Sequence, residues 1–95
     1  MNSLIEAMEY LQSHGLQPSR RTWSLGVTLE IPLGQPQDSD GILVYPNVVW
    51  LVAHRDGTWH LVERIQLRQQ HRVFSVLADA CSAVVERHAR GRITQ

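Results

Sequence analysis

The chain has 95 residues, of which 43% are hydrophobic and 19% charged, and nine arginines balance nine acidic residues at a formal net charge of zero. That length is typical of one domain, and the hydrophobic share is typical of a globular chain rather than a disordered one. A neutral chain lacks the basic excess that general nucleic-acid binders and anionic-membrane binders need. Residues 1–95 are therefore expected to form a single domain that binds neither nucleic acid nor membrane.

A capping box opens the first predicted helix. Ser3 and Glu6 have the S-x-x-E spacing, in which the hydroxyl accepts from the glutamate backbone and the carboxylate reaches back. Apolar residues then recur at helical spacing, and Gly15 supplies a left-handed stop. The pattern predicts a helix from Leu4 to His14.

Apolar and polar residues then alternate strictly over 22–31. Period two over this stretch indicates a strand with one buried face, which Pro32 ends. The next segment, 34–41, holds two glycines, a proline and the acids Asp38 and Asp40, and it therefore predicts a loop. Loops of this kind often carry recognition.

Two further strands are expected at 48–55 and 58–65, because Asp56-Gly57 between them is one of the strongest hairpin signals. A two-residue turn pairs Trp50 with Glu63 and fixes which side chains share a face. The face expected against the helices carries Val48, Trp50, Val52, His54, Trp59, Leu61 and Ile65. The second face is too apolar for plain exposure and carries Val49, Leu51, Ala53, Thr58, His60, Val62 and Arg64.

The last predicted helix follows a polar, arginine-bearing segment, 66–72. Ser75 is its expected cap, an apolar stripe that includes Cys81 is its buried side, and Gly91 is its expected end. Together the elements predict an α+β fold, in which a three-stranded antiparallel sheet is flanked by N-terminal and C-terminal helices.

Catalytic and metal-binding patterns do not occur in the sequence. None of the five histidines forms an H-x-x-x-H pair, and packing or surface positions explain them better than a metal site. Cys81 lies on an apolar helical stripe, where a free cysteine acts as a small hydrophobe. Asp38 and Asp40 lie in a loop that cannot easily hold two acids in fixed geometry. No enzyme activity, cofactor or metal is therefore expected.

A single cysteine allows no internal disulfide, so nothing in the composition indicates an oxidising compartment. Glu6 and Glu9 stand where a signal peptide needs a basic start and an apolar run. The longest apolar run, Val48 to Ala53, is too short to span a membrane. A cytoplasmic protein is expected.

The order helix, three strands, helix is also that of double-stranded-RNA-binding domains. Those domains need a lysine-rich cluster at the start of the last helix to grip phosphates. The corresponding segment here, 71–75, has Arg72 as its one certain charge. An RNA-binding module is therefore kept only as a minor alternative.

Four short motifs occur between residue 15 and the last helix: Gly15-Leu16-Gln17-Pro18, Gly57-x-Trp59-x-x-x-Glu63-Arg64, Phe74 and Ala78-Asp79-Ala80-Cys81. In this outline the chain resembles small bacterial immunity proteins, which neutralise polymorphic or secreted toxins. It departs from the outline at Ile65, where relatives usually have glycine. Without the resemblance, Trp59, Phe74 and Ala80 are explained as core, and Glu63-Arg64 as an exposed charge pair worth little.

The resemblance implies tight binding to a cognate toxin by direct protein–protein contact. The expected partner-binding residues fall on two surfaces, the acidic loop with its flanks and the second sheet face: Glu30, Asp38, Asp40 and Tyr45 on the first, Arg55, His60 and Arg64 on the second. A small homodimeric regulatory or scaffold protein fits almost as well, since a second copy would cover the surplus apolar face.

Overall fold

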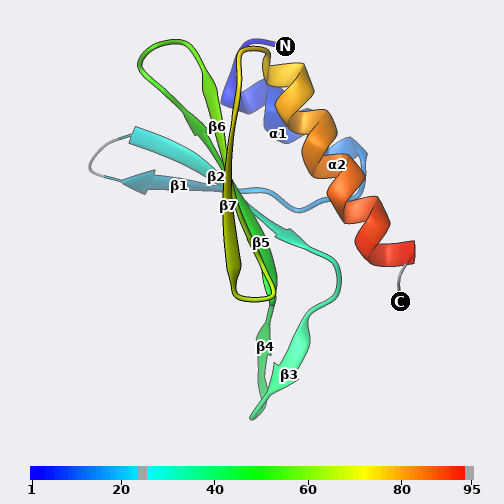
Figure 1. The fold of residues 1–95 in the computed structure, drawn as a ribbon. Coiled ribbons are helices and arrows are strands. Elements are labelled where there is room, and N and C mark those ends of the chain that lie inside the picture. Colours follow the sequence, from blue (N-terminus) through cyan, green and yellow to red (C-terminus); the bar gives the residue numbers. More distant parts are fainter. Residues whose placement is uncertain (24–25, 94–95) are drawn as a thin grey trace.

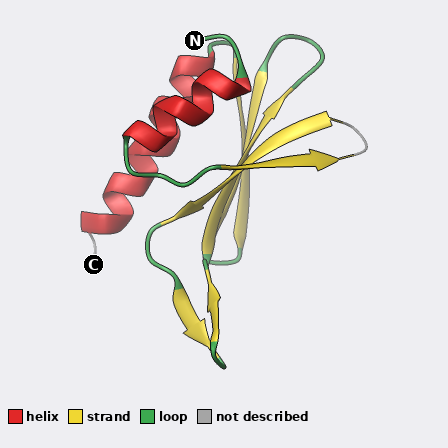
Figure 2. Cartoon of the chain, turned by 180° about the vertical axis from the view of Figure 1, so that it is seen from behind, coloured by secondary structure: helices red, strands yellow, loops and turns green. Residues whose placement is uncertain are grey.

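The computed structural model describes residues 1–23 and 26–93, and its elements follow one another in this order: α1 (Leu4–Ser13), β1 (Ser19–Trp23), β2 (Gly26–Leu33), β3 (Gln37–Ser39), β4 (Ile42–Val44), β5 (Asn47–Ala53), β6 (Trp59–Ile65), β7 (Arg68–Phe74) and α2 (Leu77–Ile93). Five strands form one antiparallel sheet in the order β1-β2-β5-β6-β7, while β3 and β4 form a separate hairpin. That hairpin projects from one end of the sheet (Figure 1). Both helices cover the same face of the sheet (Figure 2).

The α+β class is confirmed, but the predicted three-stranded sheet is wrong because two edge strands were not expected. The alternation over 22–31 runs through a hairpin, in which Trp23 of β1 pairs with Gly26 of β2. Leu25, part of that predicted strand, lies outside the described residues. At the other edge, β7 replaces the expected polar segment, and all but its last residue are exposed. An edge strand with little burial shows no apolar alternation, so its sequence resembles a loop.

The first helix matches its prediction closely. α1 spans Leu4–Ser13, and the Ser3 hydroxyl accepts from the Glu6 backbone N–H at 3.2 Å. The Glu6 carboxylate accepts from the Asn2 N–H and from the Ser3 hydroxyl rather than from the Ser3 N–H, and these two bonds lower the pKa of Glu6. At the other end of the chain α2 runs from Leu77 past the expected stop at Gly91 to Ile93. In the described residues no helix is long and apolar enough to cross a membrane.

Two Asp-Gly pairs make two different turns. At Asp40-Gly41 both residues have positive φ, 52° and 83°, which is the type I′ conformation of a two-residue hairpin loop, and β3 and β4 pair on either side of it. The segment 34–41, expected to be a loop, therefore contains β3 and the turn of this hairpin. At Asp56-Gly57 only the glycine has positive φ, 87°.

The β5–β6 turn is one residue longer than predicted. The His54 carbonyl accepts from the Gly57 N–H at 3.1 Å, and the His54 N–H donates to the Thr58 carbonyl at 3.0 Å. These bonds define a three-residue loop that ends in a glycine bulge. The strand register slips by one, so that Leu51 faces Leu61 and Trp50 no longer faces Glu63.

A slip of one residue exchanges the two faces of β5 relative to β6. Val48, Trp50 and Val52 leave the predicted core face, and Val49 and Leu51 take their place. The observed core unites the helix-covered sheet face with the inner sides of both helices: Ala7, Leu11, Leu16, Leu29, Ile31, Leu33, Val49, Leu51, Leu61, Leu77, Ala80, Cys81 and Val84.

Candidate functional site

The sheet face away from both helices is called the open face here. Because directly paired residues share a face, the strand registers place on it Ser19, Arg21, Trp23, Thr28, Glu30, Pro32, Val48, Trp50, Val52, His60, Val62, Arg64, Gln69, His71 and Val73. The prediction that one apolar sheet face lacks a helical cover agrees with this arrangement, although its β5 members differ.

Trp50 lies at the centre of the open face between fixed charges. The Arg64 guanidinium carbon lies 5.5 Å from the centroid of the Trp50 ring, within range of a cation–π contact. Glu30 pairs with Trp50 across the strands and accepts from the Arg21 Nε at 2.6 Å. An aromatic ring in contact with an arginine has the composition of an interface anchor.

The β3–β4 hairpin exposes a whole apolar strand. The exposed fractions of Ile42, Leu43 and Val44 are 66%, 70% and 44%. The hairpin tip carries Asp38 and Asp40, and the Asp38 carboxylate accepts from the Gly41 N–H at 2.8 Å. Strands of three residues are too short to be stable in isolation. The hairpin projects from the sheet as an arm (Figure 1). This arm carries one apolar strand, β4, and an acidic tip.

A shallow depression of about 330 Å³ joins the arm to the open face. Its wall on the arm side consists of Leu43, Val44 and Tyr45, and its floor consists of Ser19, Arg21, Glu30, Pro32, Val48 and Arg64. Three of the residues predicted for partner binding, Glu30, Tyr45 and Arg64, therefore line one surface. They come from both predicted surfaces, which the fold makes continuous.

The remaining predicted residues are spread more widely. Asp38 and Asp40 lie on the arm, next to the depression in sequence but exposed at the tip. His60 lies on the open face in the row of Val52. Arg55 is exposed in the β5–β6 turn, at the opposite end of the sheet from the arm (Figure 1).

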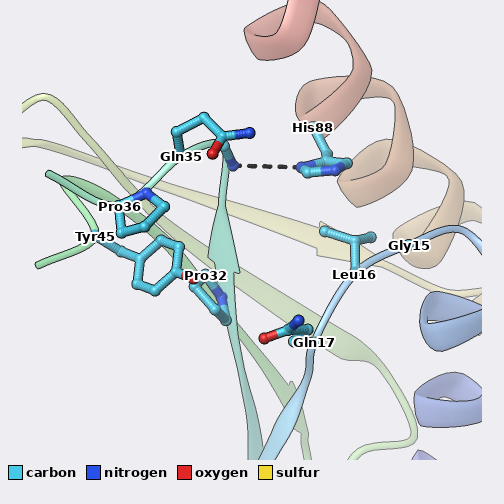
Figure 3. Close-up of a pocket in the computed structure, with 9 residues that line it drawn as sticks. Gly15, Leu16, Gln17, Pro32, Gln35, Pro36, Tyr45 and His88 are labelled. Carbon is cyan, nitrogen blue, oxygen red and sulfur yellow. Dashed lines mark hydrogen bonds between the residues drawn. The ribbon is translucent and has the colours of Figure 1, made fainter. Parts of the chain in front are cut away.

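The base of the arm is fastened to the body of the domain. In Figure 3 the Tyr45 ring lies between the rings of Pro36 and Pro32, on one wall of a pocket of about 230 Å³. Across the pocket, the Gly34 N–H donates to the Nδ1 atom of His88 on α2 at 3.3 Å. An arm held at its base can present its tip with a smaller entropy loss on binding.

Glu63 is not an exposed strand-end residue, as its sequence position had suggested. It is 1% exposed on the helix-covered face, and its carboxylate accepts from Arg72 Nε at 2.8 Å and from Arg87 Nε at 3.1 Å. This ion-pair network ties β6, β7 and α2 together. Arg64, the next residue, faces the other way.

The motif residues behind the immunity-protein resemblance are largely structural. Gly57 forms the bulge of the β5–β6 turn, and Trp59 and Phe74 pair across β6 and β7 and pack against the core. Ala80 and Cys81 are fully buried on α2, and burial raises the pKa of the Cys81 thiol to about 11. The thiol is therefore protonated near neutral pH, as expected of a core cysteine.

Three histidines meet at the end of the open face that is distant from the arm. The His54 and His60 rings stack with centroids 4.5 Å apart, and the His60 and His71 centroids are 4.9 Å apart. His60 Nδ1 lies 2.8 Å from His71 Nε2. The sequence spacing did not reveal this cluster, because it depends on the three-residue turn and on β7, neither of which was predicted.

Asp56 adjoins the histidine cluster from the β5–β6 turn. Hydrogen bonds from the Thr58 hydroxyl and the Thr58 N–H lower the pKa of Asp56 to about 2, and His54 Nδ1 lies 2.9 Å from its Oδ1. Asp56 is consequently a carboxylate throughout the physiological range.

Comparisons with protein-family models, with curated proteins and with solved structures found no match.

Proposed function

We propose that the chain is a binding protein, an immunity protein that neutralises a cognate bacterial toxin by direct contact. The arm and the adjoining half of the open face form its binding surface. The observation that carries this proposal is the exposed apolar strand Ile42–Val44 on a projecting hairpin. Full burial of an exposed side chain of this kind is worth about 1.5–3 kcal/mol, and these three side chains, 44–70% exposed, would gain a part of that on binding a partner.

The charges around this surface favour a basic partner cleft for the arm. Asp38 and Asp40 stand at the tip beside the apolar strand, as expected of an arm that enters a positively charged, substrate-binding cleft. Since the lone cysteine offers no disulfide framework, we place the encounter in the cytoplasm.

The exposed edges of the main sheet argue against simple strand addition as the binding mode. Arg20 and Arg21 lie on β1, and Arg68 and Arg72 lie on β7. Charged residues along an edge strand discourage pairing with another strand. Contact through side chains of the arm and the open face is the alternative that the surface favours.

Co-expression with the toxin-domain protein of a neighbouring gene tests the proposal. We expect the wild-type chain to restore growth and to co-purify with the toxin. Asp38→Arg with Asp40→Arg should weaken the complex by roughly tenfold or more, because the tip charges then repel a basic cleft. The control, Glu9→Arg with Glu86→Arg, adds the same charge on the helices and should bind as the wild type does. Absence of rescue by the wild type, or equal affinity of both double variants, would count against the proposal.

The second candidate is a homodimer that buries the open face, favoured by its central Trp50 and the neighbouring Val52 and Val62. Light scattering after size exclusion separates the two. A monomer at micromolar concentration supports the toxin complex. If the wild type is a dimer and Trp50→Ala dissociates it, the open face is a dimer interface rather than a toxin-binding surface.

A further inference from the structure

A second polar site lies at the end of the open face that is distant from the arm, where His54, Asp56 and His60 come together. One ligand atom from each residue lies within 4.8 Å of the others. His54 directly precedes the three-residue turn, Asp56 is in it and His60 is on β6, so the glycine bulge at Gly57 is what sets their approach. The His54 and Asp56 side chains are 49% and 57% exposed, so the site is open to solvent.

Neighbouring groups orient two of these three residues. His60 Nδ1 lies 2.8 Å from His71 Nε2, and His60 Nε2 lies 3.1 Å from the Thr58 hydroxyl oxygen. When His71 accepts the Nδ1 proton and the Thr58 hydroxyl turns away, His60 Nε2 can face a ligand. Metal-binding histidines usually donate their second N–H in this way. The Asp56 carboxylate is fixed by the Thr58 N–H at 2.9 Å and by the Thr58 hydroxyl.

We propose that His54, Asp56 and His60 bind one divalent transition-metal ion of the Zn²⁺ class, with His71 positioning the His60 ring. Two imidazoles and one carboxylate are a donor set of zinc sites in which a fourth position stays open to water. Mg²⁺ and Ca²⁺ prefer six or more oxygen ligands, which this site does not offer. The site is independent of the arm and of the proposed toxin complex.

Binding requires a small contraction of the site. Two nitrogen ligands at about 2.0–2.1 Å from a tetrahedral zinc ion lie roughly 3.3 Å apart, closer than the 4.8 Å limit observed. The His54 ring must leave its stack on His60 to reach the metal. Both changes are side-chain rotations at a turn and leave the strand register intact.

Calorimetric titration of the untagged protein with Zn²⁺ tests the site. We expect one ion per chain, a visible absorption band with Co²⁺ as the probe, and no binding of Mg²⁺ or Ca²⁺. A hundredfold excess of Zn²⁺ over its Kd should raise the Tm by roughly 10 °C or more.

Single histidine variants should lower the Zn²⁺ affinity by different amounts. His54→Ala and His60→Ala should remove the one-to-one binding, whereas His71→Ala should weaken it by roughly 10–100-fold, as expected when an outer partner is lost. His14→Ala, at the end of α1, is the control and should bind as the wild type does. The proposal would be overturned if the wild type did not bind Zn²⁺, or if His54→Ala and His60→Ala bound it as strongly as the wild type does. Circular dichroism establishes that each variant is folded.

Discussion

Replacing both Arg72 and Arg87 by methionine is expected to lower the free energy of unfolding by about 3–5 kcal/mol. The two arginines neutralise the carboxylate of Glu63, which is 1% exposed among core residues. Methionine retains much of the side-chain volume but leaves the buried charge without a partner. Urea unfolding of the double variant measures the loss, which is a large share of the roughly 5–14 kcal/mol expected for a domain of this size.

A third substitution at Glu63 should rescue the stability of the double variant, and Arg68 on the same strand offers a control. Glu63→Leu in the double-variant background removes the unpaired charge and should restore most of the lost stability, since apolar replacement of a whole buried ion pair is often neutral. Arg68→Met, on the same strand as Arg72 but outside the Glu63 network, should change stability by about 0.5 kcal/mol or less. A double variant as stable as Arg68→Met would show that the network does not hold β6, β7 and α2 together.

Leu51→Ala should destabilise the domain more than Trp50→Ala, although tryptophan is much the larger residue. Leu51 is fully buried against the helices, so its truncation is expected to cost about 2–5 kcal/mol. Trp50 lies half-buried on the open face, and its loss should cost about 1–2 kcal/mol, through strand propensity and the Arg64 contact.

The order of these two values distinguishes the observed register from the one predicted from the sequence. A two-residue turn would place Trp50 in the core, where truncation costs about 3–5 kcal/mol, and would bring Leu51 to the surface. Urea unfolding of the two variants therefore reports on the β5–β6 turn itself. A larger loss for Trp50→Ala would contradict the three-residue turn and the open face derived from it.

The sequence predicted the elements that have strong local signals. The helix after Ser3, the strands around Asp56-Gly57 and the buried position of Cys81 all follow from capping, turn propensity and apolar periodicity. Each of these signals lies within a few residues of the feature that it predicts, so tertiary context did not override it.

The errors arose where one local sequence pattern is compatible with two different backbone conformations. Asp-Gly is compatible with a two-residue turn and with a three-residue turn, and the chain uses the first at Asp40-Gly41 and the second at Asp56-Gly57. The sequence of β7 has no apolar alternation that would predict a strand, because β7 is an exposed edge strand. A one-residue difference in a turn is small locally but reverses the side chains of a whole strand.

These errors reduced the accuracy of the predicted site more than that of the predicted fold. Glu30, Tyr45 and Arg64 were predicted for binding and do line one depression. Trp50 was assigned to the core, and the exposed strand Ile42–Val44 was not recognised as part of an arm. The histidine cluster needed three correct strands and one correct turn before it could be seen.

The dissociation constant of the complex with the proposed partner, a toxin-domain protein of a neighbouring gene, tests the central claim most directly. Leu43→Asp places a charge in the middle of the apolar strand of the arm, and we expect it to weaken binding by about 100-fold or more, as for an interface hot spot. Ile5→Asp is the matched control, since Ile5 is 62% exposed on α1 and belongs to no proposed interface. Calorimetry should find the control within about twofold of the wild type. Equal affinity of Leu43→Asp and Ile5→Asp would contradict a toxin-binding arm.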